Sequence, residues 1–247
     1  MDTIPRLRRA MRLRCLPDRV EAEVEDDFHH FGVALQHDGV TVTGVVAWAR
    51  RYPWTTCAGA THALEAIRGA ELNIHPSYLF AFAAAVSHCT HMFELSAFAI
   101  AHAAARAGDR LYEAEVSDEL AGKRRARIIR DGALMLDCEL EGDVVSAPSP
   151  YAGLNVFSIR SRDLKGIGPE AAELLLILRR IVAVSRGRLS DLDAIPDIAS
   201  LGRPLNCYSG GPKKVGEARR VIGSTRDWSA GPGPAANSGP PSVGPNR

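Results

Sequence analysis

Two cysteines in this chain stand just before runs of residues with a helical pattern. Cys57 precedes the run from Ala60 to Arg68, and Cys89 precedes the run from Met92 to Arg106. The N-terminus of a helix has unpaired backbone N–H groups and the positive end of the helix dipole, so it favours an anion such as a thiolate. Metal binding and nucleophilic attack both require the thiolate form of cysteine. The spacing therefore predicts a site of thiol or metal chemistry.

Histidines close to these cysteines in sequence can complete such a site. Cysteine thiolate and histidine nitrogen are the usual ligands of zinc, and both also bind iron. Two cysteines are too few for a closed four-ligand site, so histidines must supply the other ligands. The candidates are His29, His30, His62, His88 and His91. We select Cys57, Cys89, His30 and His91 as the metal ligands. The alternative is that both cysteines only pack in the core, as free cysteines often do.

Glu94 lies three residues after His91, and this spacing puts both side chains on one face of a helix. We therefore predict catalytic roles for Cys57, Cys89 and Glu94, with Glu94 as a proton shuttle. The alternative for Glu94 is a carboxylate that only complements the helix dipole. Cys15, Cys138 and Cys207 have no partners at ligand spacing and are predicted to be structural.

The elements that must position these residues are hairpins and helices. An Asp-Gly pair between alternating apolar runs predicts one hairpin within residues 31–49 and another within residues 127–140, and Val144-Val145 adds an edge strand. Further helices are predicted over Ser77 to Val86 and from Gly168 to Arg186, where Pro169 occupies a favoured early position. This order predicts an α+β fold with a small antiparallel sheet packed by helices. A Gly-rich phosphate loop is absent, so no nucleotide cofactor is expected.

The pattern divides the chain into four parts. Residues 1–24 are predicted to form an N-terminal arm, because Ile4, Leu7 and Met11 suit a short amphipathic helix. Residues 25–107 form the core with the Cys/His site. Residues 108–208 extend the same unit with a hairpin and a helix. Residues 209–247 form a disordered tail, since their Gly, Pro and Ser content leaves too little apolar surface to bury.

Composition limits the partners. The chain has 247 residues with 30 Lys and Arg against 29 Asp and Glu, a net charge of +1, so neither nucleic acid nor a membrane surface is an expected partner. No run approaches the roughly 18 apolar residues of a membrane span. Five widely spaced cysteines and the lack of a signal peptide predict a cytoplasmic protein. A homo-oligomer is compatible with this composition.

Part of the sequence resembles a known bacterial family. The pattern consists of Pro53-x-x-x-Cys57, then Leu64-x-x-x-Arg68-Gly69-x-x-Leu72, then Cys89-Thr90-His91-Met92-x-Glu94-Leu95. It is similar to the family catalogued as domain of unknown function 2889 and covers roughly residues 25–107. The family name assigns no activity.

A more distant resemblance is to the IscU/NifU iron–sulfur scaffold proteins. Cys57 falls where their second cysteine lies, and Cys89, within His88-Cys89-Thr90, falls where their third lies. The place of the first cysteine instead reads Asp26-Asp27-Phe28-His29-His30. The resemblance implies an IscU/NifU-like core, and a metal site in which His29 or His30 replaces a cysteine.

These observations favour a metal- or thiol-dependent enzyme. The cofactor would be zinc or iron, and the substrate a small organic acid, with hydrolase or lyase chemistry. An aromatic acid is suggested by Tyr78, Phe80 and Phe82, together with Arg179, Arg180 and Arg186, which either complement a helix dipole or hold an anion. The alternative function is a non-enzymatic carrier or scaffold for metal or an iron–sulfur cluster.

Overall fold

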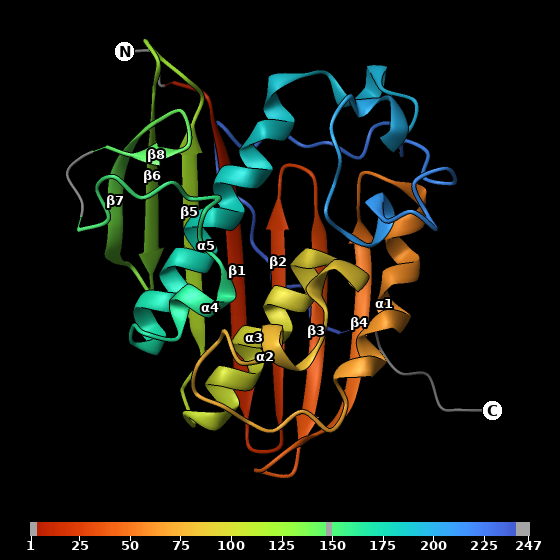
Figure 1. Ribbon diagram of the computed structural model, residues 1–247, viewed down its shortest axis with the longest axis vertical. Helices are drawn as coiled ribbons and strands as arrows, with labels where there is room; N and C mark the ends of the chain where they lie inside the picture. Colours follow the sequence, from red (N-terminus) through yellow and green to blue (C-terminus); the bar gives the residue numbers. More distant parts are fainter. Residues whose placement is uncertain (1–3, 147–149, 241–247) are drawn as a thin grey trace.

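One eight-stranded antiparallel sheet forms the frame of the protein, and its helices lie in front of it in Figure 1. The computed structural model describes residues 4–146 and 150–240. The spatial order of the strands is β4-β3-β2-β1-β5-β6-β7-β8. In chain order these strands are β1 (Arg6–Leu16), β2 (Arg19–Asp26), β3 (His30–His37), β4 (Val42–Arg51), β5 (Arg110–Ser117), β6 (Lys123–Arg130), β7 (Ala133–Glu141) and β8 (Val144–Val145).

Two long helices pack on the sheet. Helix α3 (Thr90–Ala104) contacts β2 and β3, and helix α5 (Pro169–Ser185) contacts β5, β1 and β6. The remaining α-helices are single turns, namely α1 (Ala60–Ala63), α2 (Leu79–Phe82) and α4 (Ser161–Leu164). Short 3-10 turns are η1 (Thr55–Gly59), η2 (Leu64–Ile67), η3 (Ala85–Ser87), η4 (Arg186–Leu189), η5 (Leu192–Ala194), η6 (Ile198–Leu201) and η7 (Tyr208–Gly210).

The topology repeats itself. Four antiparallel strands followed by a long helix occur twice, as β1 to β4 with α3 and as β5 to β8 with α5. The first strands of the two halves, β1 and β5, pair antiparallel at the centre of the sheet, with Ala10 opposite Glu113. The sequence shows no corresponding repeat, so this duplication is one of topology.

The α+β class is confirmed, but the predicted small sheet is wrong. The segment expected as an appended hairpin provides β6 and β7, which continue the same sheet through β5. The two predicted hairpins are β3–β4 and β6–β7, and β8 is the predicted edge strand. In the second hairpin Asp131 and Gly132 both have positive φ, 52° and 83°, as a type I′ turn requires.

The N-terminal segment is a central strand and not an arm. Leu7, Met11 and Leu13 are buried on one face of β1, and Arg9 is buried on the same face, while Arg8 and Arg12 alternate to the other face. The spacing of Leu7 and Met11 places both on one face of either a helix or a strand, whereas Leu13 shares that face only in a strand. In β2 the alternating Val20, Ala22 and Val24 are also buried.

Helix predictions succeed where the pattern is long. The runs over 92–106 and 168–186 correspond to α3 and α5, and Pro169 begins α5 as expected. The run over 60–68 forms α1 and η2. The run over 77–86 forms only α2, because the backbone becomes extended at Ala83 and Ala84.

Residues 225–240 pass behind the sheet in Figure 1, on the side away from the helices. The Arg8 guanidinium donates to the Gly231 carbonyl (2.9 Å), and the Gly239 N–H donates to Glu23 Oε2 (3.0 Å). Residues 209–240, predicted as part of a disordered tail, therefore have defined contacts. The charged outer face of the sheet supplies hydrogen-bond partners to a segment with little apolar surface of its own. Residues 241–247 of that predicted tail, and residues 1–3 of the predicted arm, lie outside the described residues.

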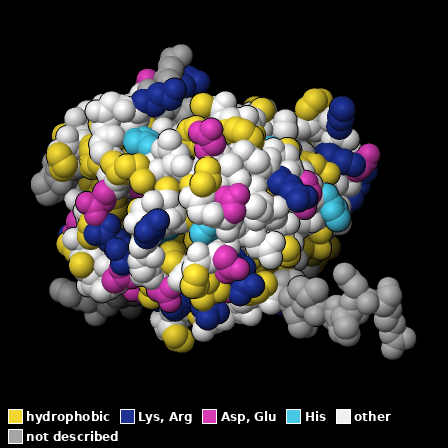
Figure 2. Space-filling view, turned by 90° about the horizontal axis from the view of Figure 1, so that it is seen from below, with side chains coloured by type: hydrophobic (Ala, Val, Ile, Leu, Met, Phe, Trp, Pro, Cys, Tyr) yellow, Lys and Arg dark blue, Asp and Glu magenta, His cyan; other side chains and the backbone are white. Residues whose placement is uncertain are grey.

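Seen from below in Figure 2, basic and acidic side chains are interspersed with apolar ones, in keeping with the net charge of +1. Within the described residues, the longest helix is α5 and no helix has both the length and the apolar character needed to cross a membrane.

Candidate functional site

A cavity of about 560 Å³ lies between the β2–β3 turn, the start of α3, one face of α5 and residues 201–209. Aromatic rings form much of its wall, including Phe31, Trp54 and Phe93. Among the described residues, no aspartate or glutamate lines it, whereas five arginines do: Arg160, Arg179, Arg180, Arg186 and Arg203. The cavity is therefore apolar in its body and positive in its charge.

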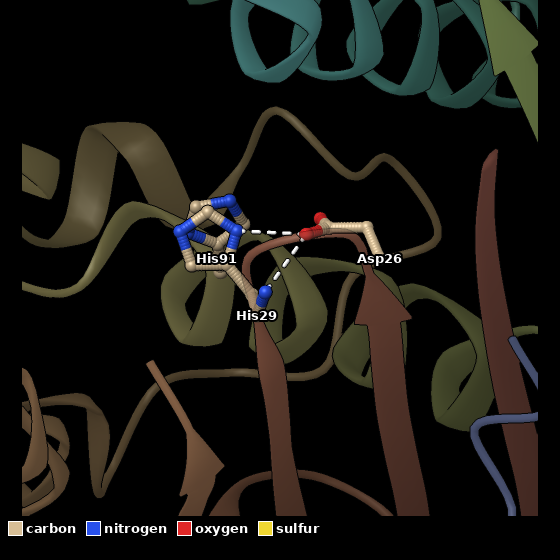
Figure 3. Close-up of side chains that lie close together, drawn as sticks. All are labelled: Asp26, His29 and His91. Carbon is tan, nitrogen blue, oxygen red and sulfur yellow. Dashed lines mark hydrogen bonds and ion pairs between the residues drawn. The ribbon is translucent and has the colours of Figure 1, made fainter. Parts of the chain in front are cut away.

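Asp26 and His29 form a hydrogen-bonded pair at the turn between β2 and β3. Asp26 is completely buried, and its Oδ1 accepts from the backbone N–H groups of Phe28 and His29, both at 2.9 Å. His29 Nδ1 also lies 2.9 Å from Oδ1. Figure 3 draws the contacts between these two residues as dashed lines. The Arg9 guanidinium donates to Oδ2. The turn thus holds the carboxylate and the imidazole in one fixed geometry.

This geometry determines the charge of Asp26 and the tautomer of His29. Burial by itself would raise the pKa of Asp26, but His29 and Arg9 outweigh it and hold that pKa well below its usual range. The ionised carboxylate accepts a proton-bearing Nδ1, which leaves His29 Nε2 as the free nitrogen. The His29 side chain is 13% exposed and lines the cavity, and Nε2 has no hydrogen-bond partner among the described residues.

His91, in the first turn of α3, lies against His29. The two ring centroids are 4.0 Å apart with an interplanar angle of 33°, and the rings overlap in Figure 3. Burial lowers the pKa of His91 well below its usual value, and a charge on His29 when that ring is protonated, together with Arg9 and Arg180, acts in the same direction. His91 Nε2 is buried with no hydrogen-bond partner among the described residues. His91 is therefore a neutral imidazole at pH 7.

Cys89 is the N-cap of α3, as its position in the sequence predicted. Its Sγ lies 4.0 Å from His91 Nδ1. Burial raises the pKa of Cys89 to about 11, although the backbone N–H groups of Met92 and His91 act in the opposite direction. The expectation of a thiolate stabilised by the helix is therefore wrong for the free protein, because desolvation exceeds the effect of the helix N-terminus.

Cys57 lines the same cavity from η1, a single 3-10 turn that is not the N-terminus of a long helix. Its Sγ accepts a hydrogen bond from Ser209 Oγ at 3.3 Å. Burial raises its pKa to about 12, and the nearby Cys89 and Cys207 add to this effect. Cys207, predicted to be structural, is thus a third cavity thiol that sequence spacing could not identify.

His30 is on the wrong side of the sheet for the predicted metal set. Its Nε2 lies 2.7 Å from Glu23 Oε1, and its Nδ1 lies 3.6 Å from Glu25 Oε1, on the face crossed by residues 225–240. Neighbouring side chains at a strand point to opposite faces, so His29 and His30 cannot share one site. His62 is exposed on α1, and His88 stacks on Phe93 at 5.0 Å.

Glu94 is buried behind the cavity and does not line it. Arg180 Nε donates to Glu94 Oε2 at 3.2 Å, and Arg180 Nη1 donates to Thr90 Oγ1 at 3.1 Å. Glu94 therefore holds Arg180 in place. This arrangement differs from the proton-shuttle role predicted from its spacing to His91.

The predicted metal set is not brought together. Cys57, Cys89 and His91 share the cavity, and His30 does not. Within the described residues, the one group of three potential ligands whose atoms all lie within 4.8 Å of one another is Asp26, His29 and His91. His29 was predicted as an alternative to His30, whereas no spacing in the sequence singled out Asp26, the last residue of β2.

No protein-family model matches this sequence, and the search of curated proteins also returned no match.

Proposed function

We propose that the protein is an enzyme that acts on a small organic acid with an apolar or aromatic body. The observation that carries this proposal is the cavity itself. Its walls are aromatic, and the described residues that line it include five arginines and no acidic side chain. His29, which is hydrogen-bonded to the buried Asp26 behind it, is part of the same lining. Ligand cavities of this size are typically apolar with a few directed polar groups.

The arginines support an anionic ligand. Arg179 lines the cavity and has no carboxylate partner among the described residues, while burial and the adjacent Arg180 lower its pKa. A crowded guanidinium in a partly buried place is an unfavourable arrangement that a bound carboxylate relieves. Arg180, held by Glu94, adds positive charge at the same wall.

The His29–Asp26 pair supports acid–base chemistry. Asp26 fixes the Nδ1–H tautomer, so Nε2 is free to accept a proton from a C–H group next to the bound carboxylate, or from a water molecule that attacks an ester or amide carbonyl elsewhere in the substrate and displaces its alcohol or amine. The imidazolium so formed is stabilised by the adjacent Asp26 charge. The negative charge that develops on the substrate lies near arginines. Proton abstraction next to a carboxylate is the first step of lyase chemistry, and water activation is that of hydrolysis.

A metal-dependent form of this enzyme is the second candidate. The ligand atoms of Asp26, His29 and His91 lie within 4.8 Å of one another, and two histidines with one carboxylate suit iron or zinc. The unpartnered His91 Nε2 favours this candidate. The existing hydrogen bonds to both oxygens of Asp26, and the nearby positive charge of Arg9, oppose it. The same group of residues is where a non-enzymatic metal carrier would bind its ion.

Binding of acids tests the proposal first. A panel of aryl and alkyl carboxylates, each beside its neutral amide, is added to the protein while its melting temperature is recorded. At about ten times Kd a ligand adds about 1.4 kcal/mol of stability, which raises Tm by roughly 3 °C for a chain of this size. Acids but not amides should produce this shift, Arg179→Gln should remove it, and the exposed Arg68→Gln should not. Equal shifts by acids and amides would refute the proposal.

Catalysis is tested by hydrogen exchange. Acids that bind are incubated with the protein in D₂O, and loss of the proton next to the carboxylate is followed by NMR. His29→Gln should abolish exchange and keep binding.

Elemental analysis of protein made without a metal-affinity tag separates the two candidates. Near-stoichiometric zinc or iron that is lost in His91→Ala would favour the metal-dependent form.

A further inference from the structure

Helix α5 and the turn η4 that continues it run along the cavity and present arginines at two levels. Arg179 and Arg186 both line the cavity and are seven residues apart, which places them on the same side of the helix. At a rise of 1.5 Å per residue, their Cα atoms are about 10 Å apart along the axis. The small residue Ala183 lies on the same wall between the two levels.

The first level contains Arg179 and Arg180. Arg180 uses its donors on Glu94 and Thr90, whereas Arg179 has no hydrogen-bond acceptor among the described residues. Arg160 is a third guanidinium at the cavity and adds to the positive charge that Arg179 experiences. This level has one carboxylate partner for its arginines, and that carboxylate faces Arg180.

The second level contains Arg186 and Arg203. Arg186 Nη2 donates to Asp143 Oδ2 at 2.6 Å, and its guanidinium lies 4.1 Å from the centroid of the Phe157 ring. These two contacts fix the Arg186 side chain. Arg203 lines the cavity beside it and has no carboxylate partner among the described residues. The second level, like the first, therefore has more guanidiniums than carboxylates.

Residues next to His29 and His91 pack against the two levels. Arg180 contacts Thr90, the neighbour of His91, and a Cβ built at Gly187 would meet the Phe28 ring at 2.7 Å. Phe28 is the neighbour of His29. The start of α3 therefore packs against the first level, and the β2–β3 turn that holds Asp26 and His29 packs against the second.

We propose that the substrate is a dianion, with one anionic group at Arg179, the other at Arg203 and Arg186, and an apolar or aromatic spacer between them. This inference rests on the proposed function and narrows its substrate class. A monoanion leaves one arginine level without a partner, and a dianion of suitable length supplies both. An α,ω-dicarboxylate or an aromatic diacid has this chemistry.

Calorimetric titration with matched acids tests the inference. The probes are straight-chain dicarboxylates from malonate to sebacate, the monocarboxylate of each chain length, and the pair terephthalate and benzoate. All titrations use one ionic strength, because screening differs for dianions and monoanions. Malonate has the same charge as the longer diacids and cannot span about 10 Å, so it controls for non-specific attraction.

The expected result is that one of the longer diacids, or terephthalate, binds at least about tenfold more tightly than its matched monoacid, while malonate shows no such advantage. Arg203→Gln, at an exposed position that should not affect folding, should remove the advantage, so that a diacid and its matched monoacid bind this variant with affinities within about twofold of each other. Arg179→Gln should weaken both classes, and Arg68→Gln should change neither.

The outcomes separate this inference from the proposed function. Equal affinity of wild type for diacids and monoacids at every length would overturn the dianion inference and leave acid binding intact. An unchanged diacid advantage in Arg203→Gln would also overturn it. Failure of every acid to bind would overturn the proposed function itself.

Discussion

The ion pair between His102 and Glu173 should make the stability of this protein depend on pH in a defined window. His102 lies in the last turn of α3, and its Nε2 is 3.0 Å from Glu173 Oε1 on α5. Both side chains are at most 10% exposed. The pair therefore joins the long helices of the two halves.

The size and sign of the effect follow from the pKa of His102. Burial alone would lower this pKa, but hydrogen bonds and charges from Cys15 and Glu173 outweigh burial and raise it from 6.5 to about 9. A histidine whose pKa is higher in the folded than in the unfolded state stabilises the fold fully below the unfolded value. That contribution is lost as pH rises through the folded value. A difference of about 2.5 units corresponds to about 3 kcal/mol at most.

Urea denaturation at several pH values between 6 and 9.5 measures this contribution. The free energy of unfolding of wild type should fall across the window, and that of His102→Gln should change less by about 3 kcal/mol. Glu173→Gln and the double variant complete a mutant cycle that isolates the pair from the other titrating groups. A constant difference between wild type and His102→Gln from pH 6 to 9.5 would refute the reasoning.

Two further predictions concern the cavity thiols and the sheet. Cys57 and Cys89, with pKa values raised by burial to about 12 and 11, should be alkylated at pH 7.5 at least roughly 100-fold more slowly in the folded than in the unfolded protein. Peptide mass spectrometry after iodoacetamide treatment checks this, and rapid labelling of either thiol would contradict it. Gly32→Ala should lower stability by about 2 kcal/mol or more, because its Cβ would lie 2.1 Å from the Trp48 ring. Thermal unfolding beside Gly108→Ala, whose Cβ meets no atom within 4 Å, measures this loss, and equal melting temperatures would show the reasoning to be wrong.

Local signals in the sequence were sufficient for several elements of this fold. The Asp131-Gly132 pair predicts a type I′ hairpin because only such residues readily adopt two successive positive φ values. Pro169 and a long apolar pattern predict α5, and Cys89 is found at the N-cap of α3. Each of these features depends on residues close together in the chain.

Other features depend on contacts between distant parts of the chain. The Arg9–Asp26 pair forms only because β1 lies beside β2. The spacing of apolar residues in β1 up to Met11 fits a helix as well as a strand, and the pairing of β1 with β2 and β5 decides for the strand. The separation of His29 from His30 depends on which face of the sheet the helices cover. Sequence alone could place both histidines before a strand and could not choose between them.

The sequence alone determined the residue types and the local turns of this protein. It supplied the cysteines, histidines and arginines from which a site could be built. Tertiary structure decided which of them meet and which are charged. It brought Arg203 and Cys207 to the cavity of Arg179 and Cys89, and it buried the thiols so that desolvation overcame the helix N-terminus. The physical reason is that burial and electrostatic interaction depend on distances in space, and the sheet joins segments far apart in the chain.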